Sequence, residues 1–317
     1  MQRICPLNEA KSLFLSTSID EPINCLPPEC FACIFHHLNT INLAGLLASV
    51  LVNKKWQKNI IYNSDKSDDL KSKIDEVHKL FLGPQQWAKF YGIKFCSDEE
   101  IQKAFSILPR DIFETLNSKC SVFPTSEKLV KETHTLVYVS KLINGRKITL
   151  TNLGKLAIRK LPLDKSKVVF DNISSYYPGM ERKKLEGYKY IRADVVAVLD
   201  KSLDQPHWVL LPIDLLEGSR GRCYEAQKKM VQELSKKSGF SYTVPKTIDA
   251  VASIIGHFLR SKEYLFGLAT YIRCQHNIDR HQVAVGNFKE EGLCVNSSPD
   301  SNDIGIAPCI IFQEKRW

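Results

Sequence analysis

The chain of 317 residues lacks any hydrophobic run long enough to cross a membrane. Its longest apolar stretches are Leu46–Val52 and Ala250–Leu259, the second with a histidine inside it, whereas a membrane-spanning helix needs about 20 apolar residues. The first twenty residues also lack the apolar core of a Sec-type signal peptide, because Arg3, Glu9 and Lys11 are spread through them. We therefore expect no membrane span and no Sec-type signal. Cytoplasmic residence and a secretion route that reads no hydrophobic segment both stay open.

Cysteine is too scarce for a disulfide scaffold. The ten cysteines are about 3% of the chain, and a protein of this length can bury a core without covalent cross-links. Free thiols in a reducing compartment are therefore favoured.

The positive charge is concentrated in one segment. The formal net charge is +9, and residues 141–192 hold thirteen basic and four acidic residues, whereas residues 1–65 hold five of each. Tyrosines lie among the basic residues, a composition that can bind nucleic acid. Because no nucleic-acid-binding signature accompanies it, a solvated basic face is favoured, with an acidic protein partner as the next interpretation and nucleic acid as the least favoured.

Residues 21–63 predict three short helices. The sequence Leu-Pro-Pro-Glu at 26–29 places proline in a first helical turn, where its missing N–H is tolerated. Apolar residues then recur at i, i+3, i+4 and i+7 from Phe31, and a further helix carries Val52 and Trp56. So small a unit has little interior of its own. Its surplus apolar residues predict an exposed patch that binds a partner.

This segment resembles the F-box. The resemblance implies a complex with the small adaptor subunit of SCF ubiquitin ligases, in which the rest of the chain captures the protein to be ubiquitinated. Between Leu38 and Leu46 the chain is about three residues longer than the common F-box spacing, roughly one helical turn, which we expect to be tolerated. An ordinary helical subdomain is the alternative. The residues expected at the adaptor interface, or in the core that supports it, are Leu26, Pro27, Pro28, Glu29, Ile34, Leu38, Val52 and Trp56.

The sequence as a whole predicts a multi-domain protein. After a flexible tail (1–20) and the all-α F-box (21–63), we expect a helical linker region (64–119) and an α+β substrate-recognition domain (120–317). In the linker region, an amphipathic pattern from Leu70 to Phe81 predicts a helix that Gly83-Pro84 ends. The C-terminal domain is expected to contain the following elements: strands at His134–Ile143, Lys147–Thr151, Trp208–Leu211, Tyr271–Cys274, Val283–Val285 and Ile310–Phe312; a hairpin turn at Asn144-Gly145; and helices at Tyr224–Lys237 and Thr247–Leu259.

Several short blocks of this domain also resemble F-box proteins of chlamydia-like bacteria that live inside protists. The resemblance implies a bacterial effector that acts as a substrate adaptor in the host cytoplasm. It implies no catalytic residue and no cofactor. The blocks are Trp87–Gly92, Lys131–His134, Thr149–Gly154, Gly218–Gly221 with Tyr224 and Gln227, and Tyr271–Gln275.

Two further groups of residues have the composition of a binding site. Cys25, Cys30, Cys33, His36 and His37 include zinc-like spacing but overlap an apolar helix face, so core thiols are favoured over a metal site. Gly218–Arg222 precedes a helix and has the composition of an anion-binding turn, yet it lacks a Walker motif, so a surface loop is favoured.

The alternative function is a thiol-dependent hydrolase or transferase in residues 120–317, recruited by the F-box. It requires a cysteine with a lowered pKa and a base within hydrogen-bond reach. The candidate nucleophiles and bases are Cys223, Cys274, His134, His207, His257, His276 and His281.

Overall fold

The computed structural model describes residues 81–91, 103–109, 111–143, 146–160, 185, 187–267, 269–297 and 303–314. The predicted tail, F-box and zinc-like cluster lie outside these residues. The helices are α6 (Pro84–Tyr91), α8 (Ile112–Asn117), α9 (Val130–Thr133), α10 (Leu150–Lys160), α11 (Ala193–Leu199), α12 (Tyr224–Ser238) and α13 (Thr247–Ser261). The strands are β1 (Phe81–Leu82), β2 (His134–Val139), β3 (Leu142–Ile143), β4 (Arg146–Lys147), β5 (Tyr188–Ile191), β6 (His207–Pro212), β7 (Tyr271–Ile278), β8 (His281–Lys289), β9 (Gly292–Ser297), β10 (Ile304–Gly305) and β11 (Ile310–Gln313).

One mixed sheet has the strand order β1-β2-β6-β11, and both of its faces are covered. β1 runs parallel to β2, whereas β6 pairs antiparallel with both β2 and β11. Every residue of β2 and β6 is buried. A strand covered on both sides has no solvent face, which explains why these two segments are nearly continuous apolar runs.

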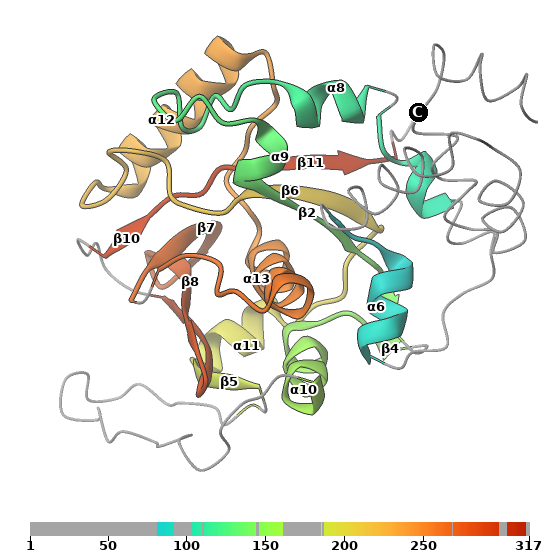
Figure 1. Cartoon of the computed structure of the whole chain (residues 1–317). Coiled ribbons are helices and arrows are strands. Elements are labelled where there is room, and N and C mark those ends of the chain that lie inside the picture. Colours follow the sequence, from blue (N-terminus) through green and yellow to red (C-terminus); the bar gives the residue numbers. More distant parts are fainter. Residues whose placement is uncertain are drawn as a thin grey trace, which may run out of the picture.

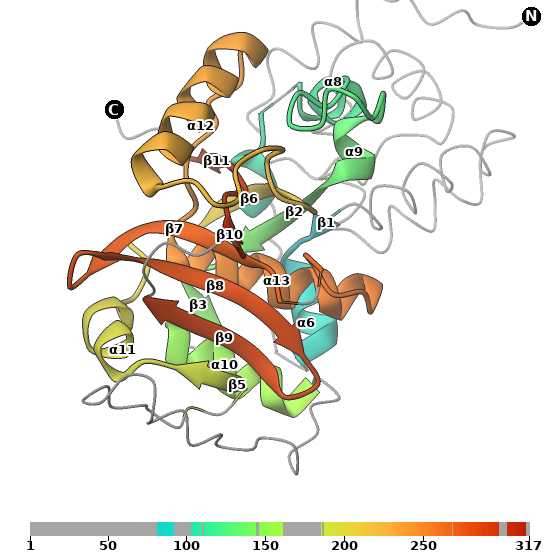
Figure 2. The same ribbon diagram turned by 90° about the vertical axis from the view of Figure 1, so that its left-hand side faces the viewer.

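The second sheet has the order β10-β7-β8-β9-β5. β7, β8 and β9 form an antiparallel meander, and the flanking strands β10 and β5 run parallel to their neighbours. Figure 2 shows this meander in front of α13.

Helix α13 lies between the two sheets (Figure 1) and contacts strands of both. Thirteen consecutive residues, Thr247–Leu259, are buried, so this helix has no solvent-facing stripe, as expected of one covered on all sides. Gly256 permits its close approach to the first sheet, because a Cβ there would lie 2.8 Å from a methyl carbon of Leu82.

The other face of the first sheet is built around an aromatic cluster. The rings of Phe81, Phe105 and Trp208 have centroids 5.5–5.8 Å apart, and the indole N–H of Trp208 donates to the carbonyl of Ala104 at 2.7 Å. Ile112 and Leu116 of α8 belong to the same buried cluster. The described part of residues 81–119 is therefore packed into the same body as the C-terminal strands.

Most of the elements predicted in the C-terminal region lie where the sequence placed them. β6, α12, α13 and β11 match within two residues, Gly239 ends α12 with φ +75°, and β3 pairs with β4 on either side of the predicted turn. Three predictions were wrong. The segment predicted as one strand, His134–Ile143, forms two, because β2 ends at Val139 and β3 pairs with β4 in a separate sheet. Phe81 lies in strand β1 and Pro84 begins α6, so the pattern from Leu70 does not continue as a helix to residue 81. The return strand ends at Lys147 because α10 begins at Leu150.

Candidate functional site

The residues expected to bind the SCF adaptor, Leu26, Pro27, Pro28, Glu29, Ile34, Leu38, Val52 and Trp56, lie outside the described residues. The zinc-like cluster Cys25, Cys30, Cys33, His36 and His37 does so as well. Within the described ranges, no group of three or more His, Cys, Asp or Glu side chains is placed to hold a metal ion. In the same part of the chain, no helix is long and apolar enough to span a membrane.

Two of the candidate thiol-enzyme residues meet at the start of α13. The side chain of Thr247 hydrogen-bonds to the thiol of Cys274 and lies 2.9 Å from Nδ1 of His276. The same Nδ1 accepts the backbone N–H of Thr247 at 3.3 Å, so it is unprotonated and the threonine hydroxyl also donates to it. The imidazole is therefore engaged by the helix start rather than by the thiol.

The electrostatics of Cys274 oppose thiolate formation. Its side chain is completely buried, and burial raises the pKa of the thiol far above its usual value, with the nearby charge of Asp249 adding to the increase. The neighbouring Cys309 is also fully buried, and burial likewise raises the pKa of its thiol. Since the thiolate is the nucleophile, the burial of both thiols weighs against a nucleophilic role.

His207 and Asp249 form a buried ion pair that joins β6 to the first turn of α13. Nε2 of His207 lies 2.9 Å from Oδ1 of Asp249, and Nδ1 lies 3.2 Å from the carbonyl oxygen of Gln205. Both ring nitrogens face acceptor atoms, an arrangement that favours the doubly protonated ring. Burial lowers the pKa of His207, but the hydrogen bond and charge of Asp249 outweigh it and leave the pKa raised.

The other candidates do not form a catalytic pair. Burial lowers the pKa of His134 to about 4 and, together with the charge of Arg260, that of His257 to about 4. Cys223 is exposed before the first turn of α12. Among the described residues, no hydrogen bond links Cys223 to a histidine, and His281 lies on β8.

The loop at Gly218–Arg222 leads into α12 as predicted and is held by buried polar groups. The amide of Gln227 donates to the carbonyl of Ser219 at 2.7 Å. One guanidinium nitrogen of Arg273 donates to the carbonyl of Arg222 at 3.1 Å and to Oε1 of Gln227 at 3.3 Å. Gln227 and Arg273 stand in the quoted sequence blocks, but only the fold shows that they contact each other under this loop.

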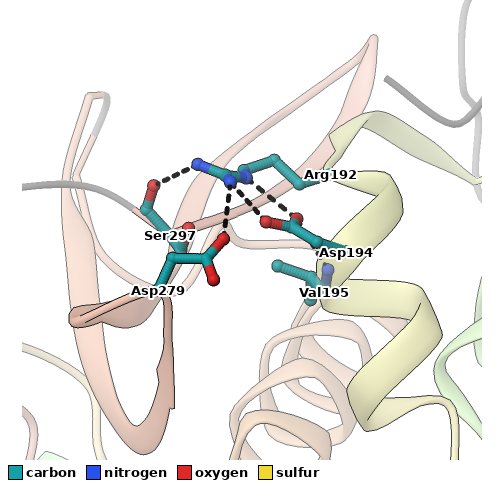
Figure 3. Close-up of polar contacts among 5 residues, drawn as sticks. All are labelled: Arg192, Asp194, Val195, Asp279 and Ser297. Carbon is teal, nitrogen blue, oxygen red and sulfur yellow. Dashed lines mark hydrogen bonds and ion pairs between the residues drawn. The ribbon is translucent and has the colours of Figure 1, made fainter. Parts of the chain in front are cut away.

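A second buried arginine joins three elements of the lower half of the molecule. The guanidinium of Arg192, which precedes α11, pairs with the carboxylate of Asp194, lies 3.9 Å from that of Asp279 in the β7–β8 turn, and donates to the carbonyl of Ser297 at 3.2 Å (Figure 3). The hydrogen bond to Asp194 raises the pKa of Arg192. No sequence motif predicted this cluster. An arginine between a strand and an apolar helix is the one local feature that could have indicated it.

The chain matches no protein-family model, no curated protein and no solved structure. In the described body, the buried polar clusters at α13, at Arg192 and at Arg273 all join secondary-structure elements to one another. Several exposed cations lie on the outer face of α12 and in the loop before it.

Proposed function

We propose that this protein is an F-box adaptor that docks on the small adaptor subunit of an SCF ubiquitin ligase and presents a substrate protein through residues 120–317. The observation that carries the proposal is the combination of Leu-Pro-Pro-Glu at 26–29, the helical spacing of Ile34 and Leu38, and the Val52–Trp56 pair. Each feature alone is common, but their combination in this order within about 40 residues is typical of this box.

The described body supports the second half of the proposal. A substrate-presenting domain must hold its partner in a fixed position relative to the ligase, and this body has a central helix buried between two sheets. The blocks that resemble proteins of chlamydia-like bacteria further favour an effector that acts in the cytoplasm of a host cell.

The thiol-enzyme alternative finds less support. The burial and raised pKa of Cys274 weigh against it as a nucleophile, and Cys223 has no histidine among its described hydrogen-bond partners. A ubiquitin-based electrophilic probe distinguishes the two functions. Covalent labelling of Cys223 or Cys274 would support the enzyme, whereas an adaptor leaves the probe unreacted at both.

Size-exclusion chromatography of the full chain with a purified SCF adaptor subunit tests the proposal. We expect co-elution at a one-to-one ratio. Leu26→Ala with Pro27→Ala should weaken the complex by about 2–4 kcal/mol, the size expected of interface hot spots. Pro6→Ala with Leu7→Ala changes the same residue types outside the motif and should leave binding unchanged. Separate elution of the wild-type protein and the adaptor would refute the proposal.

A further inference from the structure

The outer face of α12 and the loop before it carry exposed cations in a row. Helix α12 turns Gln227, Val231 and Leu234 inward. The exposed cations, here called the α12 cationic row, are Arg220, Arg222, Lys228, Lys229, Lys236 and Lys237. Within the described part of the chain, ion pairs form at other residues and none includes a member of this row.

The two arginines of the row are held in place by uncharged acceptors. Arg220 donates to the hydroxyl of Thr270 at 2.9 Å and to the carbonyl of Asp303 at 3.3 Å. Nε of Arg222 donates to the carbonyl of Gly218 at 2.6 Å. These bonds restrict both guanidinium groups without neutralising them, so their charge faces solvent from a fixed position.

The helix dipole explains only part of the α12 cationic row. Lys236 and Lys237 stand in the last turn, where cations stabilise the negative end of the helix dipole. Arg222 stands next to the positive end, where the dipole disfavours a cation, and Lys228 and Lys229 are too far from the negative end to benefit. The helix dipole therefore does not account for Arg222, Lys228 or Lys229, although Glu225 stands at i,i+3 and i,i+4 from the two lysines.

The row has the length of a short extended peptide. Helix α12 has 15 residues and is thus about 22 Å long at 1.5 Å per residue. An extended segment advances about 3.3–3.6 Å per residue, so about six or seven residues match the helix. The two lysine pairs are eight residues apart, which is about 12 Å along the axis.

The composition of this surface favours an acidic protein segment over nucleic acid. Glu225 and Glu233 are exposed among the cations and would repel a continuous phosphate backbone. Single-stranded nucleic acids also gain affinity from stacking on aromatic rings, but the one aromatic residue of α12, Tyr224, is half-buried. A peptide can place neutral side chains opposite the two glutamates and carboxylates opposite the cations.

We propose that the α12 cationic row is the surface that captures the substrate protein, and that it recognises an acidic segment of about six or seven residues. The role as a substrate site rests on the proposed adaptor function, whereas the binding of acidic segments does not. Charge complementarity of this kind mainly sets the association rate and the choice of partner, as a substrate adaptor requires.

The test measures binding of the full-length protein to a fluorescein-labelled peptide with about seven consecutive glutamates. Fluorescence anisotropy should show saturable binding that weakens as salt is added. Lys228→Glu with Lys229→Glu should weaken it at least about tenfold, because attraction becomes repulsion at two positions. Lys155→Glu with Lys201→Glu removes the same charge from exposed positions on and after other helices and should change binding less than about twofold.

Three further measurements separate the possible outcomes. Lys228→Gln with Lys229→Gln keeps the helix-forming character of the site and should give an intermediate loss, which guards against misfolding of the charge-reversed variant. If the Lys155/Lys201 control weakens peptide binding as much as the Lys228/Lys229 variant does, the proposal is overturned. It is also overturned if the protein binds duplex DNA more tightly than the peptide and the Lys228/Lys229 variant loses that DNA binding. Co-elution of the full-length protein with the SCF adaptor is measured in parallel. If the protein binds the peptide but does not co-elute with the adaptor, the adaptor function is refuted and the binding of acidic segments by the α12 cationic row is not.

Discussion

Acid should destabilise this fold through His134, and the effect can be calculated. The side chain is 4% exposed, its Nδ1 lies 3.0 Å from the hydroxyl of Thr133, and its Nε2 has no hydrogen-bond partner among the described residues. Burial lowers its pKa from 6.5 to about 4. The unfolded chain therefore binds a proton that the folded protein excludes, so stability is complete above about pH 6.5 and falls as the pH decreases toward 4.

The expected loss is about 2.5 kcal/mol between pH 7.5 and about pH 4.5, at roughly 1.4 kcal/mol per pKa unit. Urea unfolding of wild type and His134→Phe at both pH values isolates this contribution, because phenylalanine fills a similar volume and cannot be protonated. The variant should lose about 2.5 kcal/mol less than wild type on acidification. His281→Phe, at a partly exposed position, should keep the wild-type loss. An unchanged loss in His134→Phe would refute the reasoning.

Three further outcomes follow from the packing and the thiols. Gly256→Ala should destabilise the fold by about 1–3 kcal/mol, measured by urea unfolding, because its Cβ would lie 2.8 Å from Leu82. Arg192→Met should cost about 1–3 kcal/mol in the same assay because it removes the hydrogen bonds of the guanidinium to Asp194 and to the carbonyl of Ser297, and Arg192→Lys, which cannot form the forked contact, should recover only part of this. Iodoacetamide at neutral pH should label Cys223 in the folded protein, whereas Cys274 should react only after unfolding, as peptide mapping would show.

The pattern of apolar residues in the sequence predicted the elements that are apolar along their whole buried surface. β6 was predicted within one residue at each end because a strand buried on both sides is apolar throughout. The αL glycine at 239 fixed the end of α12. α13 was placed correctly, but its apolar pattern predicted one buried face, whereas Thr247–Leu259 is buried entirely. Two of its buried polar residues, Thr247 and Asp249, contact His276 of β7 and His207 of β6, and no local pattern can show that.

Elements that depend on distant partners were missed. β1 has two residues and exists because it pairs with β2, which lies more than fifty residues further along the chain. β5 aligns beside β9 across about one hundred residues. Local propensity is weak for such short strands, and tertiary context decides them.

The start of α13 shows why residue types alone do not identify a catalytic site. The cluster contains a cysteine, histidines and an aspartate, the same types that a thiol hydrolase uses, but the contacts join them differently. The carboxylate of Asp249 holds the ring of His207, the ring of His276 accepts from Thr247, and Cys274 is left with a raised pKa that the charge of Asp249 raises further. In a catalytic arrangement the carboxylate would orient the histidine that activates the thiol. Here it pairs with His207 of β6, so the cluster fixes the start of the central helix.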